Sequence, residues 1–106
     1  MREFSARQLD DFLKDTESEP LLLDVREEWE FDRCKIDGSI LIPMSQIPNE
    51  LDELDPDRVT VVICHHGIRS RHIGIYLERE GFEHVINLSG GVAAWARDVD
   101  PQMAVY

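Results

Sequence analysis

The middle of the chain, from residue 59 to residue 75, constrains the fold more than any other stretch. Residues 59–63 read Val-Thr-Val-Val-Ile, a run typical of a strand that is buried on both faces of a parallel sheet. From Ile73 onward the apolar residues recur at helical spacing. The connection between them, residues 64–70, is short and contains Gly67. The order of strand, glycine-bearing turn and helix predicts a cradle of backbone N–H groups at the positive end of a helix dipole.

Strand and helix patterns alternate along the whole chain with short connections. The expected strands cover residues 3–4, 21–25, 40–42, 59–63 and 82–88. The expected helices cover residues 6–14, 27–31, 47–54, the segment that Gly81 ends, and 92–99. This alternation predicts an α/β fold with a mostly parallel sheet and helices on both faces. With no repeat or linker, residues 1–106 are expected to form one domain.

The aromatic side chains are expected to fill the core of this fold. In the short helix over residues 27–31, either Trp29 or Phe31 is expected to turn inward. The core, rather than a ligand site, is also the expected place of Trp29, Phe82 and Trp95.

Composition limits the classes of function. The net charge of −11 and a pI near 4.6 argue against a nucleic-acid partner. No apolar run is long enough to cross a membrane, and the residues after Met1 do not resemble a secretory signal, so a cytoplasmic location is expected. The two cysteines, Cys34 and Cys64, are expected to be free thiols. No metal-ligand motif occurs, so neither a metal nor a cofactor is expected.

Cys64 stands at the mouth of the glycine-bearing turn. A cysteine beside a helix N-terminus is favoured as thiolate, which makes Cys64 the candidate nucleophile. Between Arg58 and Leu77 the sequence contains three arginines and three histidines but no Asp or Glu. This window predicts a locally positive patch that attracts a small anionic substrate.

The turn resembles the active-site loop of the rhodanese superfamily, in which the first cysteine carries a persulfide. The residues that carry this resemblance are Cys64, His65, His66, Gly67, Ile68, Arg69 and Ser70. Similar motifs occur at Asp24-Val25-Arg26, at residues 35–39, and at Gly90-Gly91 with Trp95, so the resemblance covers nearly the whole chain. Lys35 and Asp37 stand where the family usually has histidine and proline.

The resemblance implies a three-layer fold with a five-stranded sheet in the order 1-5-4-2-3. It also implies a sulfurtransferase that takes sulfur from a small anionic donor such as thiosulfate. The acceptor would be cyanide in the test tube, and a thiol or a sulfur-carrier protein in the cell. The tail from Gly90 to Tyr106 is similar to the end of rhodanese domains that are fused to enzymes activating sulfur carriers.

The loop residues are assigned roles around the candidate nucleophile. The backbone N–H groups from His65 to Ser70 are expected to stabilise the persulfide, and the Arg69 guanidinium suits an anionic group. Ser70 is interpreted first as the N-cap of the following helix, and Gly67 as a residue with a backbone angle that other residues avoid.

The histidines, the acidic support and the second cysteine have less direct roles. His65 and His66 are interpreted as loop formers with exposed rings that add positive potential, rather than as catalytic bases or metal ligands. Asp24 either caps the short helix that follows it or, as the resemblance implies, helps to hold the active-site end of the sheet. Arg26 is expected to pair with Asp24 or with a neighbouring acid. Cys34 is interpreted as incidental, with a resolving thiol as the alternative.

Two other functions fit parts of the pattern. A phosphatase or arsenate reductase of the same fold would need a roomier loop, because related phosphatases place one residue more between cysteine and arginine than the four found here. A docking or regulatory module would keep the fold without the chemistry. An intact cysteine loop favours the sulfurtransferase.

Overall fold

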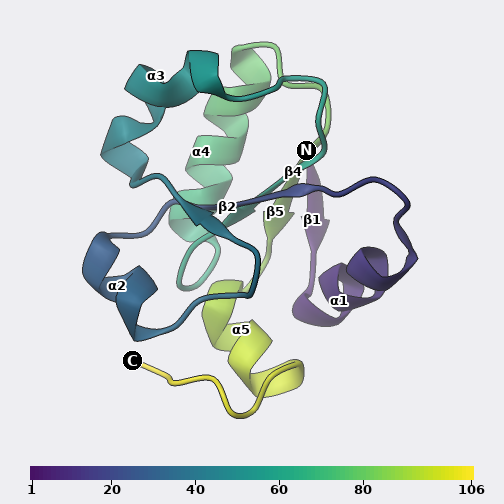
Figure 1. The fold of residues 1–106 in the computed structure, drawn as a ribbon, viewed down its shortest axis with the longest axis vertical. Coiled ribbons are helices and arrows are strands. Elements are labelled where there is room, and N and C mark those ends of the chain that lie inside the picture. The colour runs from purple at the N-terminus through teal and green to yellow at the C-terminus, as the bar shows by residue number, and fades with distance from the viewer.

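The computed structural model describes residues 1–106 as a parallel sheet between layers of helices (Figure 1). The strands are β1 (Arg2–Phe4), β2 (Leu21–Asp24), β3 (Ile40–Leu41), β4 (Thr60–Ile63) and β5 (Val85–Leu88). Their order in the sheet is β1-β5-β4-β2-β3, and every pairing is parallel. The order confirms the one that the family resemblance implies.

Helices form the two outer layers. They are α1 (Ala6–Asp15), α2 (Glu28–Arg33), α3 (Ile47–Glu50), α4 (Ile68–Arg79) and α5 (Gly91–Asp98). Helices α1 and α5 lie together over one face of the sheet, and α3 and α4 lie on the other side (Figure 1). The predicted α/β class with helices on both faces is therefore confirmed.

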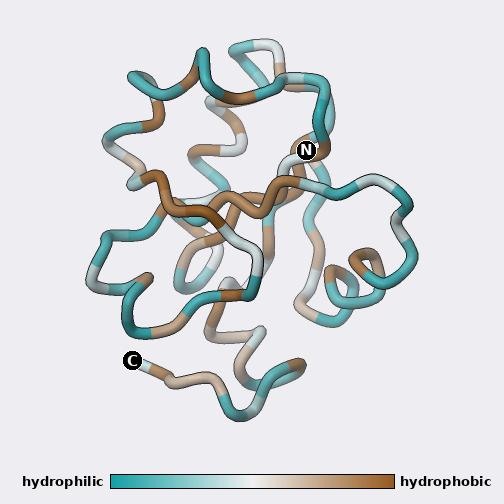
Figure 2. The backbone as a smooth tube through the Cα atoms, in the orientation of Figure 1, coloured by the Kyte–Doolittle hydropathy of each residue, from teal (hydrophilic) through white to brown (hydrophobic).

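The central strands are mostly hydrophobic and fully buried because both faces of the sheet are covered. Successive strand residues point to opposite faces, so Leu22 enters one core while Leu21 and Leu23 enter the other. The first core includes residues of α1 and α5, and the second includes residues of α3 and α4. Figure 2 shows the resulting hydrophobic centre with hydrophilic loops around it. Cys64 belongs to the second core.

Two expected elements are shorter than their sequence pattern. The helix expected over residues 47–54 is α3, followed by a 3₁₀ turn at Leu51–Glu53. The strand expected over residues 82–88 begins only at Val85. Phe82 lies in the turn before this strand and is nevertheless buried, as expected.

Helix α2 turns a different side chain inward from the one expected. Trp29 is 63% exposed and Phe31 is half-buried, whereas Glu30 is only 4% exposed. Neighbouring residues of a helix point in directions about 100° apart, so burial of Glu30 carries Trp29 outward. The placement of Trp29 in the core was therefore wrong, and an ion pair of Glu30, described below, is the reason. Trp95 is buried as expected.

Candidate active site

The loop between β4 and α4 bends at Gly67. Gly67 has a φ of +95° and is the N-cap of α4. A Cβ atom at this position would lie 2.9 Å from the Gly90 nitrogen and 3.1 Å from the Leu88 oxygen. Both the angle and the space require glycine, which confirms the special backbone expected at this residue. Since the helix begins at Ile68, the N-cap role expected for Ser70 is wrong, and Ser70 lies in the first turn.

This early start of α4 places its first N–H groups around the sulfur of Cys64. The Sγ atom accepts hydrogen bonds from the backbone N–H of Gly67 at 3.1 Å and of Ser70 at 3.3 Å. The thiol donates to the Ser70 hydroxyl at 3.3 Å. Cys64 is 1% exposed, so these donors act in a setting with little competing water. Such donors favour a negative charge on the sulfur.

A buried polar chain continues behind Ser70. The Ser70 hydroxyl donates to Oδ1 of Asn87 on β5. The Asn87 amide donates in turn to Oε1 of Glu3 at 2.8 Å and to the carbonyl of Gly67 at 3.1 Å. Asn87 therefore ties the loop to two strands. Sequence reasoning missed it, although a polar residue between Ile86 and Leu88 in an apolar run was a usable signal.

Helix α5 supports the same loop from its other side. The N–H groups of Val92 and Ala93 donate to the carbonyl oxygens of Cys64 at 2.9 Å and His65 at 3.1 Å. A Cβ atom at Gly91 would collide with both of these carbonyl oxygens. The second residue of the Gly90-Gly91 pair is thus glycine because α5 starts directly against the loop.

Asp24 and Arg26 form a buried pair at the end of β2. Both side chains are fully buried, and Nη2 of Arg26 lies 2.7 Å from Oδ2 of Asp24. The Arg26 Nε donates to the same carboxylate, which makes the pair bidentate. Arg26 also donates to the carbonyl of Cys34 at 2.6 Å. The pairing that the sequence suggested is confirmed, and the Arg26 guanidinium ties β2 to the segment after α2.

Arg69 points away from the cradle toward α2. Its two terminal nitrogens donate to the two carboxylate oxygens of Glu30 at 2.7 and 2.9 Å. Tyr106 also donates its hydroxyl to Glu30, at 2.8 Å, and accepts from Arg26 at 2.8 Å. The hydrogen bonds from Arg69 outweigh burial and lower the pKa of Glu30 to about 2. Sequence reasoning missed Glu30 and Tyr106 because both are distant from the loop along the chain.

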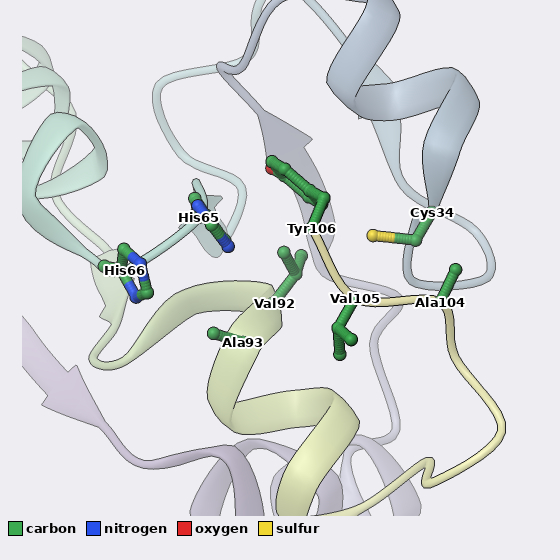
Figure 3. Close-up of a pocket in the computed structure, with 8 residues that line it drawn as sticks. All are labelled: Cys34, His65, His66, Val92, Ala93, Ala104, Val105 and Tyr106. Carbon is green, nitrogen blue, oxygen red and sulfur yellow. The ribbon is translucent and has the colours of Figure 1, made fainter.

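The ring of His65 is stacked between two other rings. Its centroid lies 4.0 Å from that of His66 and 4.0 Å from that of Tyr106. Figure 3 shows the Tyr106 ring beside His65. Burial lowers the pKa of His65, and the neighbouring His66 lowers it further. His65 is therefore neutral near pH 7 and half-buried, contrary to the exposed and positive ring expected; His66 is exposed as expected.

The positive patch expected from the sequence window is largely neutralised. Arg69 pairs with Glu30, and Arg71 pairs with Glu3 at 3.1 Å. Arg58 precedes β4 and so lies at the opposite end of that strand from Cys64. The pairing acids, Glu30 and Glu3, lie outside residues 58–77 in the sequence, and only folding brings them close to these arginines.

A small pocket of about 100 Å³ lies on the tail side of the loop (Figure 3). It is lined by Cys34, His65, His66, Val92, Ala93, Ala104, Val105 and Tyr106.

Both cysteines are free thiols, as expected, and Sγ of Cys34 lies 3.7 Å from Nη1 of Arg26. The chain brings no cluster of three or more metal-ligating side chains together.

Comparison with known proteins places the fold in a family. The family model described as "Rhodanese-like domain" matches residues 5–98. The chain belongs to the rhodanese-like family. A solved rhodanese-like domain protein from Staphylococcus aureus superposes on this rhodanese-like domain with a TM-score of 0.82 at 29% identity, covering 90% of this chain and 91% of that one. None of the helices is long and apolar enough to span a membrane.

Three sequence relatives are informative about this rhodanese-like domain. It is 36% identical to a sulfurtransferase of Allochromatium vinosum, covering 98% of this chain and 96% of that protein. It is 31% identical to the thiosulfate sulfurtransferase GlpE of Shewanella oneidensis, covering 90% and 95%. It is 38% identical to the probable adenylyltransferase/sulfurtransferase MoeZ of Mycobacterium tuberculosis, covering 94% of this chain but only 26% of MoeZ. The class that these relatives support is a rhodanese-family sulfurtransferase.

Proposed function

We propose that this rhodanese-like domain moves sulfane sulfur from a donor such as thiosulfate to a thiophilic acceptor through a persulfide on Cys64. The observation that carries the proposal is the pair of N–H groups, from Gly67 and Ser70, that meet at the Cys64 sulfur. The name of the Shewanella relative, a thiosulfate sulfurtransferase of similar length, supports thiosulfate as the first donor to test.

The reaction divides into two balanced half-reactions. The Cys64 thiolate attacks the outer sulfur of thiosulfate, the sulfur–sulfur bond of the donor breaks, and sulfite leaves with the bonding electron pair. The acceptor then attacks the outer sulfur of the Cys64 persulfide, and the Cys64 thiolate leaves. With cyanide as acceptor the product is thiocyanate. Because the enzyme alternates between two covalent states, ping-pong kinetics are expected.

The role of the loop is to stabilise the anionic states of this cycle. The thiolate and the persulfide both carry negative charge, and fixed N–H groups need no reorganisation to stabilise it. His65 to Ser70 are proposed to contact the transferred sulfur and its donor. Asp24 and Arg26 are proposed to support the loop from β2.

The acceptor in the cell is proposed to be a thiol or a sulfur-carrier protein. The similarity to MoeZ, a probable adenylyltransferase/sulfurtransferase, supports a protein acceptor. A Bacillus subtilis relative named as a putative sulfur carrier protein, 34% identical over 74 residues, supports the same route.

Intact-mass spectrometry after incubation with thiosulfate tests the persulfide. The wild type is expected to gain one sulfur atom that cyanide removes. Cys64→Ser is expected to gain none, while Cys34→Ser gains sulfur as the wild type does. If sulfur is found on Cys34 instead, or on neither cysteine, the proposed mechanism fails and the docking module becomes the better interpretation.

A further inference from the structure

The ion pair between Glu30 and Arg69 affects which sulfur donors bind favourably at the loop. Arg69 is the one arginine within the cradle residues 64–70, and Glu30 occupies both of its terminal nitrogens. His65 is neutral, and the guanidinium of Arg26 is matched by Asp24. The two guanidinium groups near the loop, those of Arg69 and Arg26, are therefore each matched by a carboxylate before any dianion arrives.

Glu30 is held firmly in this position. Its side chain is 5% exposed and accepts four hydrogen bonds: two from Arg69, one from the Tyr106 hydroxyl, and one from the backbone N–H of Glu27 at 3.0 Å. Tyr106 is itself fixed by Arg26 and by its stacking on His65. Arg69 can turn toward a substrate only by leaving a buried carboxylate unpaired, which is costly.

We propose that Glu30 is a specificity-determining residue: by neutralising Arg69 it disfavours dianionic donors such as thiosulfate relative to donors of lower charge, namely persulfides of organic or protein thiols. The inference rests on the function proposed above and narrows its donor class. With a persulfide donor, the Cys64 thiolate attacks the terminal sulfur, the sulfur–sulfur bond breaks, and the donor thiol leaves as thiolate. The same kinds of bond form and break as in the reaction with thiosulfate. The two classes of sulfur donor therefore differ in the charge that they bring to the loop.

Two probe donors test how the charge of the donor affects the same sulfur-loading step. Thiosulfate is a dianion that releases sulfite, and benzenethiosulfonate is a monoanion that releases a sulfinate. The rate of Cys64 loading is measured with each donor for the wild type, Glu30→Gln and Glu28→Gln. Glu28 lies exposed on the same helix, so its substitution removes the same charge without touching Arg69.

Glu30→Gln is expected to raise the rate constant for thiosulfate about fivefold and that for benzenethiosulfonate about twofold, because the Coulomb energy scales with the donor charge. Added salt is expected to reduce the gain. Glu28→Gln is expected to change neither rate by a comparable amount. A structural role of Glu30 would instead lower both rates together and would leave their salt dependence unchanged.

A second set of variants distinguishes an effect of charge from a loss of folding. Arg69→Gln is expected to lower the thiosulfate rate relative to the monoanion, because Glu30 is then uncompensated. The double variant with Glu30→Gln is expected to restore the wild-type ratio of the two rates. Unchanged ratios in variants that all load Cys64 would overturn the role of Glu30 and leave the proposed function standing. Absence of loading in every protein, with both donors, would overturn the proposed function and this inference together.

Discussion

At the scale of single residues, the sulfur of Cys64 is surrounded by backbone N–H groups and one hydroxyl, and no acid or base contacts it. The hydroxyl of Ser70 has two tasks. It accepts a hydrogen bond from the Cys64 thiol and donates one to the buried amide oxygen of Asn87. This arrangement suits a nucleophile that works as an anion, because the surroundings stabilise charge rather than remove a proton.

The substitution Ser70→Ala tests this double role. It leaves the Asn87 oxygen without a donor in a buried place, so the free energy of unfolding should fall by about 1–3 kcal/mol. Loading of Cys64 with sulfur should also slow. Urea unfolding and donor kinetics measure the two effects, with Ser45→Ala, at an exposed position, as the control. Equal stability of the two variants would show that Asn87 finds another partner.

At the scale of elements, the loop is held between the starts of two helices. Helix α4 and its N-cap Gly67 supply donors to the Cys64 sulfur, and α5 supplies donors to the carbonyl oxygens of Cys64 and His65. The position of α5 therefore fixes the direction in which the loop amides point. Gly91 makes this contact possible, because any side chain there would push the helix away from the loop.

The substitution Gly91→Ala tests this contact, with Gly81→Ala as the matched control. Gly91 has a φ of +60° and no room for a Cβ atom, whereas Gly81 has a φ of +96° and open space around it. Both alanine variants carry backbone strain of roughly 1–2 kcal/mol, and only Gly91→Ala adds the collision. Gly91→Ala is expected to be the less stable in urea and to load sulfur more slowly. If the two variants lose equal stability, α5 can shift without cost.

At the scale of the whole molecule, the Glu30 carboxylate joins three distant parts of the chain. It binds Arg69 of α4 and the hydroxyl of Tyr106 while it belongs to α2. The pKa of Glu30 is lowered from 4.5 to about 2, chiefly by Arg69. A carboxyl group with a depressed pKa stabilises the fold above its ordinary pKa, and this contribution is lost as the pH falls toward the folded value.

Acid unfolding measures this contribution. Between about pH 5 and pH 2, the wild type should lose about 1–3 kcal/mol more stability than Glu30→Gln, which has no proton to bind at that position. The comparison uses urea titrations at several pH values, and the other carboxyl groups cancel between the two proteins. Parallel pH curves would mean that the ion pair contributes nothing to folding.

The sequence predicts most of the architecture and only part of the site. Strand and helix patterns locate every strand and every α-helix, because periodicity reflects which faces are buried. Local rules failed where a distant partner decided the outcome: Trp29 was expected inside, but Glu30 took that place because Arg69 lies opposite. The positive window was neutralised in the same way, since its acids come from remote segments. Asn87 could have been found from its polarity within a buried strand.

The contact between Trp29 and Tyr106 has a practical consequence. The two rings meet edge to face with centroids 5.6 Å apart, and Trp29 is exposed whereas Trp95 is buried. Trp29 is therefore expected to emit at longer wavelength than Trp95, and displacement of Tyr106 would change the surroundings of its indole ring. The protein thus carries an intrinsic fluorophore beside its C-terminal segment, and seating of that segment over His65 can be followed optically without a label.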